Sequence, residues 1–180
     1  MLNRRQCVCG ALALSLLERP AGAQMREAVP VSPARGPLLG QARFTFFGFG
    51  VYDATLWAQR PAQPEQAHRM PAVLELRYLR RFSGQAIAER SLAEMQAAAA
   101  VPQATAQRWL AQMQALFPDV QDGDRLTGEH LPGQAALFWF NQAPLGRIDD
   151  AAFAAAFFGI WLAPTTSAPA LRAALLGLPT

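Results

Sequence analysis

The chain has 180 residues, of which 52% are hydrophobic and 16% charged, a composition that excludes wholesale disorder and fits one globular domain. Its formal charge of +3 is concentrated in the first 23 residues, and the remainder carries 13 arginines against 12 acidic residues. A nearly neutral chain without a basic run lacks the charge pattern of a nucleic-acid-binding protein.

The first residues have the three parts of a secretory signal peptide, predicted over Met1–Ala23. Arg4 and Arg5 form a positive start, and Cys7–Leu17 is an apolar run. Ala21–Ala23 then matches the small-residue pattern of a cleavage site. The apolar run is too short to cross a bilayer as a helix.

Both cysteines of the chain, Cys7 and Cys9, lie inside this segment. Cleavage would therefore leave residues 24–180 as a single domain with no disulfide and no thiolate. We expect a periplasmic or secreted protein with no transmembrane segment in its mature form.

Residues 24–37, with three prolines, lead into a short strand predicted around Leu38–Phe44, which runs into an aromatic stretch, Arg43–Trp57. Phe, Val, Thr, Tyr and Trp favour an extended strand here, and its two apolar faces predict a cover on both sides. One face lacks side chains at the glycines between Phe46 and Tyr52. This gap indicates either an apolar slot with a phenol at its edge or a bulge at a sheet corner, and the sequence leaves both open.

Gln59–Pro71 is polar with three prolines, which predicts a surface loop. Val73–Arg81 follows as a strand with alternating side chains. One face of this strand carries Leu74, Leu76, Tyr78 and Arg80.

Two helices are predicted next. Ser83 is placed to cap a helix that ends near Ala99, with Ala88, Leu92, Met95 and Ala99 along its apolar line. We expect Glu89, Arg90 and Glu94 to be solvated. Pro102 begins the second helix and Pro118 ends it.

Two strands, Arg125–Leu131 and Ala135–Phe140, and a short strand ending at Ile148 come next. Asp149 is predicted to cap a helix over Ala151–Leu162, which is apolar nearly all round and therefore expected against a sheet. A last helix, Pro169–Leu176, is predicted to stop at Gly177. This order of strands and helices predicts an α+β fold with a mainly antiparallel sheet.

Common catalytic motifs are missing from the sequence. It has no P-loop, no G-x-S-x-G, and no G-x-G-x-x-G between a strand and a helix. His68 and His130 have no partner at ligand spacing, and Asp119, Asp122 and Asp124 do not match an EF-hand. We predict neither a metal site nor a cofactor.

The candidate binding residues are polar groups on apolar strand faces: Arg43, Tyr52, Tyr78 and Arg80. An arginine and a tyrosine together could clamp a carboxylate, because Arg offers a charged fork and Tyr a hydroxyl donor. Strict alternation puts Arg43 and Tyr52 on opposite faces unless a bulge intervenes. The alternative is that these arginines form structural ion pairs with Glu75, Asp53 or the Asp149–Asp150 pair.

Four segments, in this order, resemble the bacterial chalcone isomerase-like proteins. The resemblance covers nearly the whole mature chain. The segments are G-F-G-V-Y-D-A-T-L-W (48–57), L-E-L-R-Y-L-R-R-F-S-G-Q-A-I-A-E-R-S (74–91), F-P-D-V-Q-D-G-D-R-L-T-G (117–128), and A-F-F-G-I-W-L (156–162) with the L-L-G ending at 175–177.

The resemblance implies an open-faced β-sandwich, with a long antiparallel sheet against a helical layer and a ligand cleft between them. The family includes plant enzymes that close a chalcone to a flavanone and non-catalytic relatives that bind fatty acids. It implies that Arg43 and Tyr52 face the cleft at the ligand carboxylate. The plant enzymes' catalytic tyrosine and lysine correspond here to Ile87 and Arg90, and isoleucine cannot hydrogen-bond a ketone or a water.

Our first hypothesis is an exported protein that binds a hydrophobic carboxylate, such as a fatty acid, in that cleft. The second is a chalcone isomerase-like intramolecular lyase that needs no cofactor, with Arg43 stabilising the enolate. The third is an interaction module of the cell envelope whose groove receives a partner protein.

Overall fold

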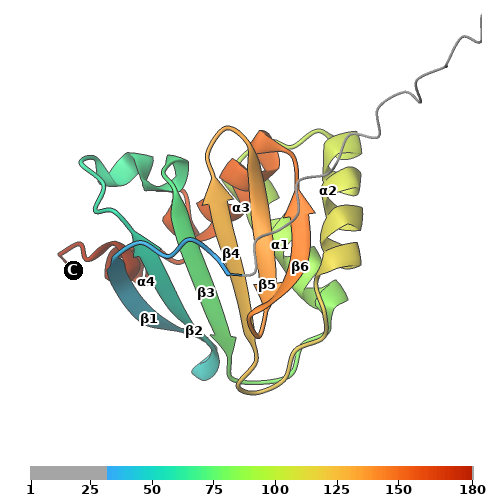
Figure 1. Ribbon diagram of the computed structural model, residues 1–180, viewed down its shortest axis with the longest axis horizontal. Helices are drawn as coiled ribbons and strands as arrows, with labels where there is room; N and C mark the ends of the chain where they lie inside the picture. The colour runs from blue at the N-terminus through green and yellow to red at the C-terminus, as the bar shows by residue number, and fades with distance from the viewer. Residues whose placement is uncertain (1–31, 180) are drawn as a thin grey trace, which may run out of the picture.

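The computed structural model describes residues 32–179, so the predicted signal peptide at residues 1–23 lies outside the described part of the chain. Within that part, one antiparallel sheet has its strands in sequential order from β1 to β6 (Figure 1). The strands are β1 Leu38–Phe46, β2 Phe49–Ala58, β3 Ala72–Tyr78, β4 Arg125–Leu131, β5 Ala135–Phe140 and β6 Ala143–Ile148.

The helices lie behind this sheet, on one of its faces (Figure 1). Helices α3 and α4 pack directly on strands, α3 on β4 and β5 and α4 on β1 and β2, whereas α1 packs on α2 and α3. The predicted α+β class and antiparallel sheet are confirmed. The helices are α1 Gly84–Ala98, α2 Gln103–Leu116, α3 Ala151–Leu162 and α4 Pro169–Leu176, with a short 3-10 helix η1 at Pro64–Arg69 inside the predicted loop.

Local signals account for most helix ends. The Ser83 hydroxyl accepts the Ala86 amide at 3.1 Å, as predicted for the start of α1. Gly177 ends α4 with a left-handed φ of 61°. At α3 the cap is Asp150 and not Asp149, since the Asp150 carboxylate accepts the amides of Ala152 and Phe153, each at 2.9 Å.

The aromatic stretch is a hairpin and not one broken strand. Phe47 and Gly48 have φ of 48° and 80° and form its two-residue turn between β1 and β2. Positive φ at both positions matches the twist of the paired strands. The expected break near the glycines is therefore a reversal of the chain. A bulge lies next to it, because Phe44 pairs with Tyr52 and Thr45 with Gly50, which leaves Val51 of β2 without a partner in β1.

Helix α3 supplies the centre of the core, as its apolar composition predicted. Phe153 and Phe158 are fully buried, and Phe157 packs edge-on against Phe138 of β5, with ring centroids 5.3 Å apart. In the described part of the chain no helix is both long enough and apolar enough to span a bilayer.

The expectation that the aromatic stretch is covered on both sides is wrong. Helices cover only the inner face of β1 and β2 (Figure 1). The apolar residues that suggested a second cover include Phe47 and Phe49, which lie at the hairpin tip and are 85% and 63% exposed. Because the stretch forms a hairpin, these apolar residues lie at its tip and do not require a second layer over the outer face of the sheet.

Candidate functional site

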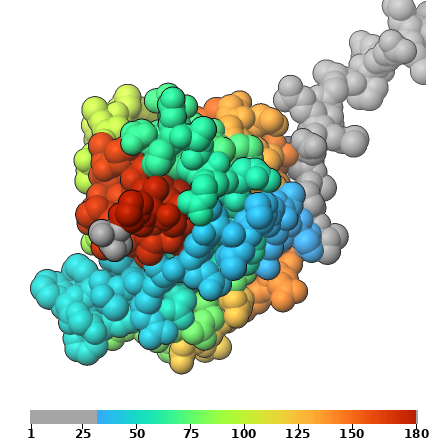
Figure 2. Space-filling model, turned by 90° about the vertical axis from the view of Figure 1, so that its left-hand side faces the viewer, coloured from blue at the N-terminus to red at the C-terminus, as the bar shows by residue number. Residues whose placement is uncertain are grey.

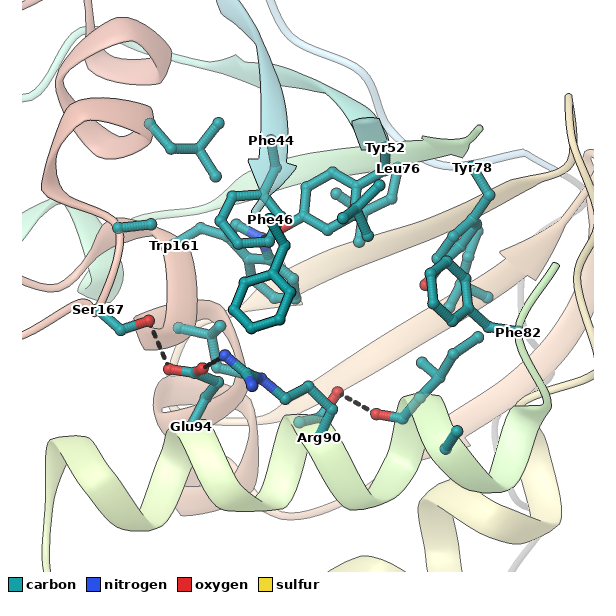
Figure 3. A pocket seen from close by; sticks show the side chains of 18 of the residues that line it. Phe44, Phe46, Tyr52, Leu76, Tyr78, Phe82, Arg90, Glu94, Trp161 and Ser167 are labelled. Atoms are coloured by element: carbon teal, nitrogen blue, oxygen red, sulfur yellow. Dashed lines mark hydrogen bonds and ion pairs between the residues drawn. The ribbon is translucent and has the colours of Figure 1, made fainter. Parts of the chain in front are cut away.

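An apolar cavity of about 380 Å³ lies between one end of the sheet and the helices (Figure 3). Strands β1 to β4 form one wall, and α1, α3 and the start of α4 form the other. Its lining is mostly aromatic and aliphatic and includes Phe44, Phe46, Leu76, Phe82, Ile87, Leu126, Phe157, Ile160 and Leu171.

Tyr52 of β2 sits in the sheet wall of the cavity. Its ring stacks on Phe44 at 5.1 Å between centroids, and its hydroxyl accepts a hydrogen bond from Trp161 Nε1 at 2.9 Å. Burial raises the pKa of the Tyr52 phenol to about 12, with Trp161 acting in the opposite direction. The phenol therefore stays neutral at physiological pH.

Tyr78 of β3 lies beside it, with the two rings edge-on at 6.2 Å. The side chain is only 4% exposed, and burial raises the pKa of its phenol well above its ordinary value. Within residues 32–179, no group hydrogen-bonds the Tyr78 hydroxyl. The ring of Tyr78 is buried, but its hydroxyl oxygen borders the cavity and is available to hydrogen-bond a ligand there.

Three charged side chains line the cavity: Arg80, Arg90 and Glu94. Arg90 and Glu94 form an ion pair one turn apart on α1, and the Ser167 hydroxyl donates to the other Glu94 oxygen at 2.7 Å (Figure 3). Arg80 lies over the Phe49 ring at 5.6 Å. Two cations against one anion leave the cavity with a positive bias, which favours an anionic head group.

Three of the four predicted binding residues, Tyr52, Tyr78 and Arg80, line this cavity. The fourth, Arg43, does not, in contrast to the expectation that it faces the cleft. It pairs with Asp53 at 2.7 Å on the outer face of the sheet, as the ion-pair alternative proposed. The bulge does not move it, because Phe44 pairs with Tyr52 and Arg43 with Asp53 on the same side of the irregularity.

Sequence reasoning missed the α1 and α3 contribution. Glu94 was expected to be solvated, yet its side chain is 14% exposed. Arg90 is solvated as expected, at 62% exposed, and also borders the cavity. The apolar helix Ala151–Leu162 was expected only to pack on the sheet, and Trp161 within it also lines the cavity. The signal for Arg90 was present, because it follows Ile87 by three residues on one helix face, and Ile87 lines the cavity too.

Within the described residues, no group of three or more His, Cys, Asp or Glu is arranged to hold a metal ion. The polar side chains that line the cavity are Tyr52, Tyr78, Trp161, Ser91 and Ser167, together with the three charged groups.

An antiparallel sheet that is closed on one face by helices, with an apolar cavity between the layers, defines the structural class of this protein. The chain belongs to the chalcone isomerase-like family, whose model matches residues 18–177.

Two similar proteins extend this finding. An uncharacterized protein of Haemophilus influenzae is 32% identical over 139 residues, which cover 77% of this chain and 67% of that one. The crystal structure of a fatty-acid binding protein of Arabidopsis thaliana superposes with a TM-score of 0.62, covering 82% of this chain and 90% of that chain. With 10% sequence identity, this second likeness shows a shared fold.

Proposed function

We propose that this protein is an exported binding protein for a hydrophobic carboxylate, such as a fatty acid, held in the cavity between the sheet and the helices. The observation that carries the proposal is the cavity itself. Its volume of about 380 Å³ falls in the range of small-molecule sites, about 300 to 1,000 Å³. The Arabidopsis neighbour with the same fold is described as a fatty-acid binding protein.

The apolar lining supports an alkyl chain as the bulk of the ligand. Each methylene moved from water into such a lining contributes about 0.8 kcal/mol. A chain of ten or so methylenes therefore offsets the cost of ordering the ligand.

The rim supports a carboxylate as the head group. Arg80 and Arg90 both border the cavity, and an arginine binds a carboxylate through two parallel, charge-assisted hydrogen bonds. The free hydroxyl of Tyr78 offers a further donor from the sheet wall.

A matched ligand series tests the proposal. Dodecanoate, dodecanol and butyrate would be titrated calorimetrically into delipidated protein. Dodecanoate should bind most tightly, dodecanol more weakly for lack of the charge, and butyrate weakly for lack of the chain. Equal affinity for the acid and the alcohol would show that the site does not recognise a carboxylate. If neither compound bound, the proposed binding function would be wrong.

Arginine variants locate the head group, and the chain supplies its own control. Arg80→Gln and Arg90→Gln should each weaken dodecanoate binding several-fold while leaving dodecanol unchanged. Arg43→Gln removes the same charge from the opposite face of the sheet, where Arg43 pairs with Asp53. It should leave both affinities unchanged, and an equal loss in all three variants would indicate a non-specific charge effect.

Export rests on the sequence of Met1–Ala23. Expression of the full chain in a Gram-negative host, followed by cell fractionation and mass measurement, should give a periplasmic protein that begins at Gln24. A full-length protein in the cytoplasm would contradict this part of the proposal.

A further inference from the structure

The tip of the β1–β2 hairpin exposes an unusual amount of aromatic surface. Phe46, Phe47 and Phe49 are 51%, 85% and 63% exposed, and among the described residues the remaining large exposed hydrophobic side chain is Leu38, at the other end of β1. Figure 2 shows this hairpin, in cyan, protruding from the body of the molecule.

Phe47 occupies this tip against local preference. Its φ is 48° and Gly48 follows with a φ of 80°. Asn-Gly is the preferred pair for such a turn, whereas positive φ in a bulky residue is uncommon. A phenylalanine that is exposed and in a disfavoured conformation contributes little to folding, so its surface points to an interaction outside the chain.

The aromatic tip is continuous with the entrance of the cavity. Phe46 is both exposed and part of the cavity lining, and the Arg90 guanidinium lies 5.9 Å from its ring centroid. Arg80, the other cation of the cavity rim, lies over Phe49. Each ring at the base of the tip therefore has a guanidinium next to it.

This combination fits the interfacial zone of a bilayer. Phenylalanine rings on a membrane-binding surface bury into the boundary between head groups and acyl chains, and cationic side chains beside them attract anionic lipids. Together the three rings expose the equivalent of about two phenylalanine side chains, on the order of 400 Å². A stable protein–protein interface needs roughly 800 Å² on each partner, so the tip by itself is small for a protein partner and sufficient for shallow insertion into lipid.

Acidic groups also lie near this end of the molecule: Glu94 pairs with Arg90 at the cavity, and Asp53 pairs with Arg43 on the outer face of the sheet. Asp119, Asp122 and Asp124 belong to the loop before β4, and this loop meets β3 through hydrogen bonds from Tyr78 to Asp124 and from Gly123 to Tyr78. The hairpin meets β3 from the opposite side, through β2. The acidic loop thus approaches β3 from the side away from the hairpin.

We propose that the β1–β2 hairpin is a membrane-docking element, which inserts Phe46, Phe47 and Phe49 into the surface of an anionic phospholipid bilayer and places the cavity entrance against it. The transfer of a ligand between the bilayer and the cavity rests on the proposed function. The docking of the hairpin does not.

Vesicle flotation tests docking with no ligand present. The full mature chain should float with phosphatidylglycerol-containing vesicles, less with pure phosphatidylcholine, and less again at high salt because the arginine contribution is screened. Phe47→Asn should lower vesicle affinity by roughly tenfold, the effect expected from withdrawing one phenyl ring from lipid. Leu38→Asn, at the far end of β1, is the matched control and should float like the wild type.

The same substitution separates docking from folding. Because Phe47→Asn creates the preferred Asn-Gly turn, it should unfold at an equal or higher urea concentration than the wild type while losing vesicle affinity. Wild-type protein that does not float with anionic vesicles, or a Phe47→Asn variant that floats equally well, would overturn the proposal. Neither result depends on whether dodecanoate binds the cavity.

Discussion

The indole of Trp161 donates a hydrogen bond to the hydroxyl of Tyr52 at 2.9 Å, and so joins helix α3 to strand β2 across the wall of the cavity. The two residues are 109 positions apart in the chain. This bond links the helical layer to the sheet beside the cavity, since both residues line it.

Removing the Tyr52 hydroxyl should destabilise the protein. In a Tyr52→Phe variant the Trp161 N–H loses its acceptor in a mostly buried position. An unpaired buried donor costs about 1 to 3 kcal/mol, so the free energy of unfolding should fall by that amount in a urea titration. Combining Tyr52→Phe with Trp161→Phe should cost less than the sum of the two single changes, because the pair shares one bond. Simple additivity would show that the bond contributes little.

Stability should decrease at alkaline pH. Burial raises the pKa of Tyr52 from 10.0 to about 12 in the folded protein, so between these values the folded state holds a proton that the unfolded state has lost. The contribution is complete below pH 10 and disappears as the pH rises through about 12, a total of about 2 to 3 kcal/mol. Burial of Tyr78 acts in the same direction.

Urea titrations from pH 8 to pH 11.5 measure this slope. Tyr52→Phe is the control, and it should show a shallower decline because one of the two buried phenols is gone. A wild-type stability that is flat across this range would contradict the burial argument.

Neutralising Glu94 should strengthen the binding of a carboxylate. Glu94 holds Arg90 in an ion pair and places a negative charge on the cavity wall. Glu94→Gln frees the guanidinium and removes the repulsion, which should tighten dodecanoate binding about fivefold, or about 1 kcal/mol, as for other partly exposed charge pairs. Dodecanol, which carries no charge, should bind as before.

The control for this change lies one turn earlier on the same helix. Glu89→Gln removes an exposed carboxylate that hydrogen-bonds Gln85, and it should leave both affinities unchanged. Tighter binding of dodecanol by Glu94→Gln would show that the substitution acts through cavity shape and not through charge.

Asp150 should be the most important single carboxylate for α3. It accepts the amides of Ala152 and Phe153 at the helix start and the indole N–H of Trp109 at 2.9 Å. Burial opposes its ionisation, but these hydrogen bonds and that from Arg108 together lower its pKa. Its stabilising effect is therefore present above pH 3.8, its ordinary pKa, and is lost as the pH falls through the lower folded value.

Asp150→Ala should cost about 2 kcal/mol or more in urea unfolding, because it removes a helix cap and leaves a buried indole without an acceptor. Asp150→Asn keeps the capping oxygen but replaces the oxygen that accepts from Trp109 and Arg108 with an NH2 group, so it should cost less than the alanine change but more than nothing. Equal losses in the two variants would show that the bonds from Trp109 and Arg108, and not the cap, are what matter.

The family and the fold class could be predicted from the sequence because they depend on short motifs and on the order of the secondary-structure elements along the chain. Ser83, Pro118 and Gly177 mark helix ends, since capping and proline act within a few residues. The strands Arg125–Leu131 and Ala135–Phe140 were predicted at their observed bounds. The placement of Tyr52, Tyr78 and Arg80 beside the cavity was also anticipated from apolar strand faces.

What the sequence by itself determined, then, was the order and kind of elements, because these depend on periodicity and on residues close together in the chain. Only the tertiary structure decided which charges meet the cavity. Arg43 lies on the outer face because its pairing with β2 sets its side of the sheet. The packing of α1 on α2 and α3 leaves Glu94 at the cavity wall with 14% exposure, while Arg90 borders the cavity and stays 62% exposed. The side on which each charged residue lies depends on contacts between segments far apart in sequence. A local sequence pattern does not say which distant segments will be in contact.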